Sequence, residues 1–245
     1  MYITHFGVKI KEKESNHISK AVYLAAKPEG MEHWEEEDYT NQRKRADINY
    51  DLNMEYFKSL DERDFSNYIL KQCKKYKMTE CINLNEVAGV AGIYMLVLDK
   101  YKQVYIGLSD DIKKRVMQHW RNQKSLERLI FGDICNSVIS IDSFGAFDTT
   151  RIFYIKTYSQ YTLEERILKS FDTRYTLNRT AGGIGSVDTY TGDQASAVLA
   201  VSANRRGKNL IQFVDIDRLK ETVSEKSFEY YLERYPELIH KKQTV

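Results

Sequence analysis

Two tyrosines, an arginine and a histidine have the types and spacing to act together on a phosphate group. Arg115 and His119 are four residues apart, so on a helix their side chains project from one face within reach of one ligand. A guanidinium binds phosphate oxygens with a planar fork of donors, and an imidazole exchanges protons near neutral pH. Tyr94 and Tyr105 lie in two neighbouring apolar runs. Each residue alone is more often a packing or surface residue, so the hypothesis of a site rests on their occurring together.

The segments around these side chains predict a β-hairpin followed by a helix. Gly92–Leu98 and Val104–Leu108 are rich in strand-forming residues, and a polar segment of hairpin length joins them. Ser109 then suits the N-cap of a helix. An apolar stripe with a spacing of four residues follows and gives this helix a face to bury: Ile112, Val116 and Trp120.

Other segments predict strands and helices around this hairpin. Residues 2–10 alternate well enough for one strand, and residues 138–141 and 152–158 are also rich in β-forming types. Apolar residues within 51–78 have the spacing of one or two amphipathic helices. Short helices are also expected at residues 18–26, 125–131, 194–203 and 224–234, and a turn at residues 182–185.

A further helix is predicted over residues 163–174, and two adjacent glutamates lie at its start. Thr162 suits its N-cap, and Thr-x-x-Glu from Thr162 to Glu165 has the form of a capping box, in which the Glu165 side chain bonds back to the cap. Glu164 lies about 100° round the helix from its neighbour. Glu165 is therefore assigned a structural role, and Glu164 is left to face the hairpin.

Several of these residues also carry a family resemblance. Gly92-Ile93-Tyr94, ten further residues and then Tyr105-Ile106-Gly107 resemble the signature of the GIY-YIG nuclease superfamily. The resemblance covers residues 88–185, about two-fifths of the chain. Either triplet alone is a weak signal, since Ile and Tyr are ordinary strand residues. The later positions of the family pattern are also filled and in order: Arg115, His119, Glu164 within Leu-Glu-x-x-Ile-Leu-Lys, and Asn178.

The resemblance implies an α+β fold with a small three-stranded antiparallel sheet flanked by helices. The nuclease domain would span residues 86–185. A mostly helical N-terminal extension, residues 1–85, would precede it and help to grip DNA, and a helical C-terminal extension, residues 186–245, would follow it. The resemblance also implies a Mg²⁺-dependent endonuclease, with Mn²⁺ as a substitute, that cuts double-stranded DNA to 5′-phosphate and 3′-hydroxyl ends.

The same resemblance assigns roles to the site residues. Glu164 would be the Mg²⁺ ligand, which is plausible with one carboxylate because this ion keeps much of its hydration shell. Arg115 would hold a non-bridging phosphate oxygen, and Asn178 would support the site through hydrogen bonds. Tyr94 would orient or deprotonate the attacking water with help from Tyr105 or His119. Whether Tyr94 or His119 is the general base stays open, since a free tyrosine has a pKa of roughly 10.

More than one biological role fits this pattern. A restriction-type or homing-type enzyme is favoured. A repair nuclease of the excinuclease type normally carries long additional domains. The main alternative from another class is a catalytically inactive DNA-binding or assembly module that retains the fold, and the six filled site positions argue against it. The oligomeric state is open, a homodimer being one way to cut both strands.

Composition sets the broad class of the protein. Hydrophobic residues make up 42% and charged residues 29% of 245 residues, which is typical of a globular chain. The longest apolar run, residues 87–98, is well short of the roughly 20 residues of a spanning helix. Three cysteines without a C-x-x-C spacing indicate neither a disulfide framework nor a zinc site, so a reducing, cytoplasmic compartment is expected. The net charge is only +2, so the total predicts no strong field for nucleic acid.

Overall fold

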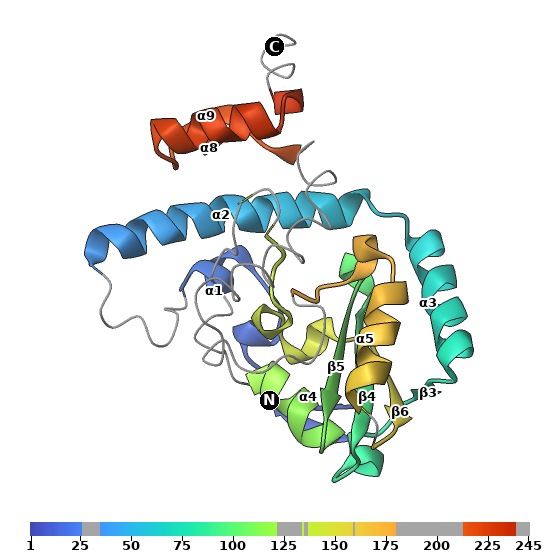
Figure 1. Ribbon diagram of the computed structural model, residues 1–245. Helices are drawn as coiled ribbons and strands as arrows, with labels where there is room; N and C mark the ends of the chain where they lie inside the picture. Colours follow the sequence, from blue (N-terminus) through green and yellow to red (C-terminus); the bar gives the residue numbers. More distant parts are fainter. Residues whose placement is uncertain (26–34, 122–133, 135–136, 159, 180–212, 239–245) are drawn as a thin grey trace.

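A computed structural model of the chain shows an α+β protein. Its described part contains seven α-helices and two antiparallel sheets, one of two strands and one of four. In Figure 1 the long helix α2 crosses above the larger sheet, and α8 and α9 lie on the far side of α2 from that sheet. The residues that the structure describes are 1–25, 35–121, 134, 137–158, 160–179 and 213–238.

The larger sheet has four strands in the order β3-β6-β4-β5. The prediction of three strands was wrong, because β3 adds a short edge strand that pairs with β6 through Thr79↔Tyr154 and Glu80↔Phe153. A strand of two residues is too short to show the alternation by which strands are predicted. The bounds are β3 Thr79–Glu80, β4 Gly92–Leu98, β5 Gln103–Ser109 and β6 Arg151–Lys156.

The N-terminal residues form a hairpin rather than the single strand predicted for residues 2–10. Strand β1 is Tyr2–His5 and β2 is Val8–Lys11, and they pair antiparallel. Phe6 and Gly7 between them both have positive φ. A glycine adopts this conformation without steric cost, so the chain reverses here.

Strand β4 separates two layers of core. Tyr94, Leu96 and Leu98 point to the face that packs with the helices α1, α2 and α4. Ile93, Met95 and Val97 point to the other face, which packs with α3 and α5. This alternation follows from the two-residue period of a strand, and burial on both faces explains why the run is continuously apolar. The helices bounding the two layers are α1 Lys20–Ala25, α2 Glu36–Ser59, α3 Glu62–Tyr76, α4 Ile112–Arg121 and α5 Gln160–Ser170.

Three local predictions about caps and strands were wrong. Asp111, not Ser109, has the N-cap contact of α4, because its Oδ1 accepts from Lys114 N at 2.9 Å. Helix α5 begins at Gln160, so Thr162 lies inside the helix and no capping box forms there. Residues 138–141 form no strand. This segment instead leads into the short 3-10 helix η4 Ile141–Ser143. The other 3-10 helices named in the described part of the chain are η1 Glu14–Asn16, η2 Leu84–Val87, η3 Asp99–Tyr101, η5 Ala146–Asp148 and η6 Thr173–Tyr175.

The C-terminal helices pack on α2. Helix α8 is Ile216–Lys220 and α9 is Glu225–Arg234, and the latter matches the helix predicted at residues 224–234. A third apolar cluster joins both helices to α2 through buried side chains such as Leu52 and Leu219. The Arg218 guanidinium forms ion pairs with two carboxylates of α2, Asp47 and Asp51. The segments predicted at residues 125–131, 182–185 and 194–203 lie outside the described residues. Within the described residues, each helix is too short or too polar for a membrane span.

Candidate active site

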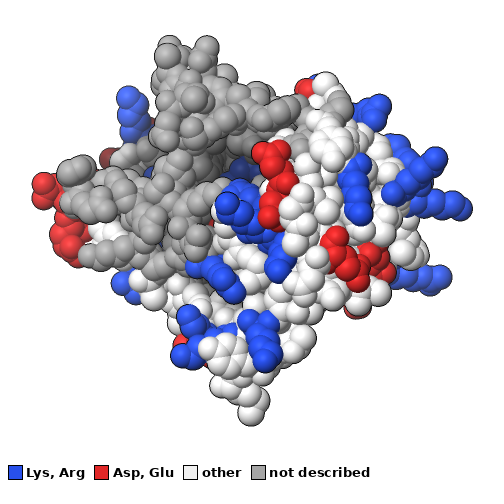
Figure 2. Space-filling view, turned by 90° about the horizontal axis from the view of Figure 1, so that it is seen from below, with Lys and Arg blue, Asp and Glu red and all other residues white. Residues whose placement is uncertain are grey.

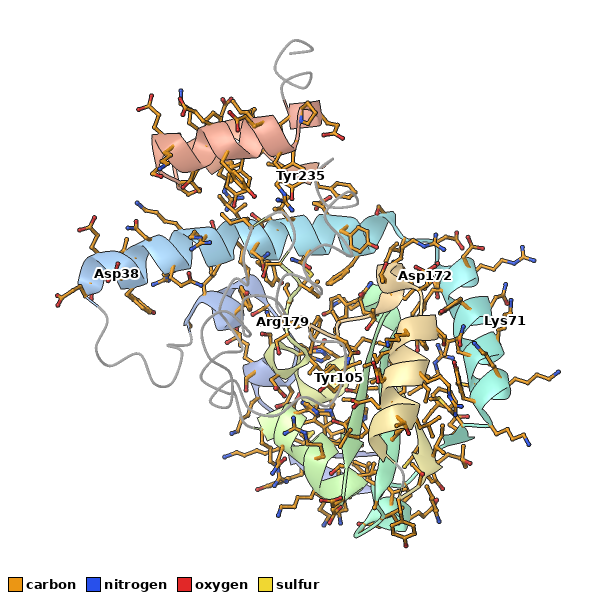
Figure 3. The ribbon with its side chains drawn as sticks, in the orientation of Figure 1. Asp38, Lys71, Tyr105, Asp172, Arg179 and Tyr235 are labelled. Carbon is orange, nitrogen blue, oxygen red and sulfur yellow. The ribbon has the colours of Figure 1, made fainter. Side chains whose placement is uncertain are left out.

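The β4–β5 hairpin places Tyr94 and Tyr105 on one face of the sheet. In the strand register Tyr94 is opposite Gly107 and Tyr105 is opposite Leu96, so the two tyrosines are diagonal neighbours whose side chains share a face. Their ring centroids are 6.2 Å apart. Tyr94 is fully buried and Tyr105 is half-buried. Figure 3 shows Tyr105 within the fold, whereas Lys71 points outward from α3.

Gly107 makes room for the Tyr94 hydroxyl. A Cβ at position 107 would lie 2.5 Å from Tyr94 Oη and 2.9 Å from Tyr105 Cε1. Both separations are below van der Waals contact, so an added methyl must displace one of the two rings.

We therefore expect Gly107→Ala to move the Tyr94 hydroxyl and to destabilise the fold by about 1–3 kcal/mol, the usual cost of overpacking. Urea denaturation measures the destabilisation. Gly89→Ala is a useful comparison. Its Cβ would meet no atom within 4 Å but would sit at a positive φ of 67°, so that variant isolates backbone strain from crowding of the tyrosine. Equal spectra for the tyrosines of Gly107→Ala and the wild type would contradict this account.

Helix α4 brings Arg115 and His119 to the same tyrosines. Ile112 and Val116, both fully buried, fix this helix against the sheet. One turn separates the arginine and the histidine, as the sequence predicted. The Tyr94 hydroxyl is 2.6 Å from His119 Nε2, and the His119 and Tyr105 rings are 5.0 Å apart. The structure therefore brings together four of the six predicted side chains.

Asp142 is a member of this cluster that the sequence reasoning missed. Its carboxylate is hydrogen-bonded to His119 Nδ1. His119 is 2% exposed and Asp142 is 5% exposed. The three groups form a buried chain from the phenol through the imidazole to the carboxylate. The sequence predicts a strand at residues 138–141, just before Asp142, and a single aspartate at the end of such a segment carries no local signal for a contact 23 residues away.

The loop that carries Asp142 is held by helix α2. The Asn49 side-chain amide donates to Ile134 O at 3.2 Å and to Ser137 O at 2.8 Å. The Asn53 amide donates to Ser137 O at 2.9 Å. Both asparagines are fully buried, where an unmade hydrogen bond is costly. The N-terminal extension therefore contributes to the geometry of the site through the backbone of this loop.

Burial and charge act in opposite directions on Tyr94. Removal from water raises the pKa of the Tyr94 phenol well above its usual value, and Tyr105 adds to this increase. The Arg115 guanidinium lowers the pKa of Tyr94 through its charge and a hydrogen bond. Burial also lowers the pKa of Arg115, but Tyr94, Tyr105 and Asp142 outweigh it, so that pKa is raised and Arg115 stays charged. The tyrosine can therefore lose its proton only with the help of these cationic and proton-accepting neighbours.

Glu164 lies on α5, the helix that covers the opposite face of the sheet from α4. Its side chain is 4% exposed, and its Oε2 atom accepts no hydrogen bond from the described residues. Burial raises the pKa of Glu164 to about 7. Glu165 is exposed and pairs with Lys169 at 2.7 Å, one turn further along α5, instead of capping the helix. Of the two glutamates, Glu164 is the one that faces the protein interior.

The Glu164 carboxylate is compatible with a Mg²⁺ ligand. A buried carboxylate oxygen without a partner is costly, and a cation would satisfy it. No group of three or more His, Cys, Asp or Glu side chains suited to a metal occurs in the part of the chain that the structure describes. A Mg²⁺ ion at Glu164 would therefore be held by one carboxylate and by water, which this ion accepts.

Asn178 is bonded to the backbone of β5. Its Oδ1 accepts from Ile106 N at 3.0 Å, and its Nδ2 donates to Ile106 O at 2.6 Å. Thr176 Oγ1 also donates to Asn178 Oδ1 at 2.9 Å. The Asn178 side chain thus bonds to the backbone of the edge strand next to Tyr105. These contacts engage both its oxygen and its nitrogen, and none of them is with the tyrosine–histidine cluster.

Positive and negative side chains are mixed on the surface near this end of the fold. Figure 2 shows Lys and Arg groups spread over the described part of the face seen from below, with groups of Asp and Glu between them. On α4, Lys114 and Arg121 are exposed, whereas Arg115 is half-buried. Lys113 is partly used by the protein, since its Nζ donates to Asn85 Oδ1 at 2.7 Å.

Fold and site together define an α+β protein with a buried tyrosine–histidine–aspartate cluster on one face of an antiparallel sheet. Comparison of the chain with protein-family models, with curated proteins and with solved structures found no match.

Proposed function

We propose that this protein is a Mg²⁺-dependent endonuclease of the GIY-YIG type that hydrolyses phosphodiester bonds of double-stranded DNA, in a restriction-type or homing-type role. The observation that carries the proposal is the 2.6 Å contact between the Tyr94 hydroxyl and His119 Nε2, with Arg115 interacting with the same phenol. A proton acceptor, an activated hydroxyl and a phosphate-binding cation are the groups that water attack on a phosphodiester requires.

The proposed reaction begins with proton transfer within the cluster. Tyr94 gives its proton to His119 Nε2, and the resulting phenolate takes a proton from water. The hydroxide so formed attacks phosphorus, the bond from phosphorus to the 3′ oxygen breaks, and that oxygen takes a proton from solvent. The products are a 5′-phosphate and a 3′-hydroxyl.

The half-buried side chains of the cluster would bind the substrate. Arg115 would hold a non-bridging oxygen through charge-assisted hydrogen bonds, and Tyr105 would contact the attacking water or the phosphate. Glu164 would hold the Mg²⁺ ion, which would supply charge neutralisation at the phosphoryl group. Since α5 covers the other face of the sheet from α4 and contacts the edge strand β5, the ion and the phosphate would meet at that edge. Lys114 and Arg121, exposed on α4, would contact neighbouring phosphates of the duplex, which fix its position without reading its sequence.

A second function is favoured by the burial of the cluster. Tyr94 is fully buried and His119 is 2% exposed, as expected for side chains that only stabilise the fold. A DNA-binding or assembly module that retains this fold without catalysis would have the same feature. Cleavage separates the two functions.

We expect the purified protein to nick or linearise plasmid DNA with Mg²⁺ or Mn²⁺ and to stop when EDTA is added, while DNA binding largely survives. The metal ion neutralises negative charge that develops in the transition state of cleavage. Contacts of Lys and Arg with the DNA phosphates do not need the metal ion. Agarose electrophoresis measures cleavage, and a mobility shift in EDTA measures binding. Cleavage that continues undiminished in EDTA would contradict the metal site, and binding without cleavage under all conditions would support the non-catalytic module.

A further inference from the structure

The buried chain of hydrogen bonds determines the proton positions on His119. Asp142, the acceptor at Nδ1, has no proton to donate when it is ionised, so Nδ1 must carry the hydrogen. Nε2 is then the unprotonated nitrogen of neutral His119, and it lies 2.6 Å from the Tyr94 hydroxyl. The imidazole can accept the phenol proton only in this tautomer.

We propose that Asp142 is a positioning residue that holds His119 in the Nδ1–H tautomer and so makes His119 the proton acceptor for Tyr94. This role rests on the proposed nuclease function. The O–H bond of Tyr94 breaks as an N–H bond forms at His119 Nε2, which gives a phenolate and an imidazolium. The Asp142 carboxylate compensates the positive charge of that imidazolium, as a carboxylate does in a hydrolase triad.

The surroundings of Asp142 favour a fixed orientation. Ser140 Oγ accepts from Asp142 N at 3.2 Å and so caps the short helix η4. The preceding backbone is tied to α2 by Asn49 and Asn53, as described above. These contacts hold the main chain on both sides of Ser140 and so favour one orientation of the Asp142 carboxylate toward His119.

Asp148 offers a contrast in the same part of the chain. Its side chain is also buried, but it accepts from the backbone N–H groups of Ile18 and Gly145 and from the Tyr101 hydroxyl. These contacts join η5 to the N-terminal segment and do not reach His119. Asp148 therefore serves the fold, and its substitution provides a matched control for Asp142.

The first test is nitrogen NMR of the imidazole in the wild-type protein labelled with ¹⁵N-histidine. We expect the His119 signals of a neutral ring protonated at Nδ1. A ring protonated at Nε2 would overturn the proposal without any need for a variant or for cleavage activity.

The second test is Asp142→Asn. An amide can direct its NH₂ group at Nδ1, which favours the wrong tautomer; in a serine–histidine–aspartate triad this change lowers turnover about 10⁴-fold. We expect the tautomer signals to change and cleavage of plasmid DNA to fall by about 10²-fold or more, with a shifted pH profile. Tyr94 on β4, Tyr105 on β5 and Asp142 on η4 contact His119. Arg115 on α4 interacts through its charge with each of these three groups.

The outcomes separate this inference from the proposed function. Asp148→Asn should lower the melting temperature but leave the His119 tautomer, and the pH profile of the folded protein, unchanged. Asp142→Asn with wild-type rate, pH profile and tautomer would overturn the proposal. A wild-type protein that never cleaves would contradict the nuclease function, while its NMR signals would still decide whether Asp142 fixes the tautomer of His119.

Discussion

Glu164→Gln is expected to abolish Mg²⁺-dependent cleavage and, at the same time, to stabilise the metal-free protein at alkaline pH. Burial raises the pKa of Glu164 from 4.5 to about 7. A carboxyl group whose pKa is higher in the folded protein than in the unfolded chain destabilises the folded protein as it ionises. This destabilisation is absent at a pH below the pKa of the unfolded chain and complete at a pH above the pKa of the folded protein. At about 1.4 kcal/mol per pH unit between the two values, the cost is about 3 kcal/mol.

Urea denaturation of metal-free protein checks this prediction at two pH values. The variant should unfold with a higher midpoint than the wild type near about pH 8, where the wild-type carboxylate is charged, and with a similar midpoint near about pH 4, where the carboxyl is neutral in both states. Mg²⁺ should raise the melting temperature of the wild type and not that of the variant, because only the wild type retains the ligand.

Glu165→Gln is the matched control for this experiment. Glu165 is exposed and its contact is an ion pair with Lys169, and pairs of this kind one helical turn apart contribute about 0.3–0.5 kcal/mol. The control should keep its activity and its response to Mg²⁺. An inactive Glu165 variant beside an active Glu164 variant would reverse the assignment of the metal ligand.

Arg115→Lys is expected to lower the cleavage rate by an order of magnitude or more, although the charge is kept. The Arg115 guanidinium interacts with the Tyr94 phenol and donates to Gln118 Oε1 at 3.3 Å. A planar guanidinium can make these contacts and still bind a phosphate oxygen, whereas an ammonium group lacks this fork of donors. The pKa of Tyr94 should also rise, because a flexible ammonium stabilises the phenolate less well.

Single-turnover cleavage at saturating protein measures the chemical step without a contribution from DNA affinity. Lys114→Gln on the same helix is the control, since Lys114 is exposed and its loss should weaken DNA binding in a salt-dependent way with little effect on the single-turnover rate. If Arg115→Lys kept the wild-type rate, phosphate binding by the guanidinium would be excluded, and the role of Arg115 would be limited to its hydrogen bonds around Tyr94.

Local sequence patterns predict the elements that carry the four central side chains. The apolar run at residues 92–98 is strand β4 with the predicted bounds, and the run at 104–108 lies within β5. The helix after them was also recognised, since its four-residue stripe is buried through Ile112 and Val116. These patterns are local, and local periodicity is what a single sequence expresses most clearly. From them the shared face of Arg115 and His119 followed by helix geometry, whereas the shared face of Tyr94 and Tyr105 depends on the strand register of the folded hairpin.

Contacts between groups far apart in the sequence depend on the folded chain. Asp142 contacts His119 across 23 positions, and Asn49 reaches the loop of Asp142 across 85 or more. Neither contact produces a periodic residue pattern from which it could be predicted. The two-residue strand β3 is too short to show a period, and Ser109 and Asp111 are equally good N-cap types, so the sequence alone does not identify Asp111 as the cap. The burial of Glu164, with its pKa of about 7, likewise depends on the core that surrounds it. Proton positions and pKa values in this protein are therefore set by side chains that come together only when the chain is folded.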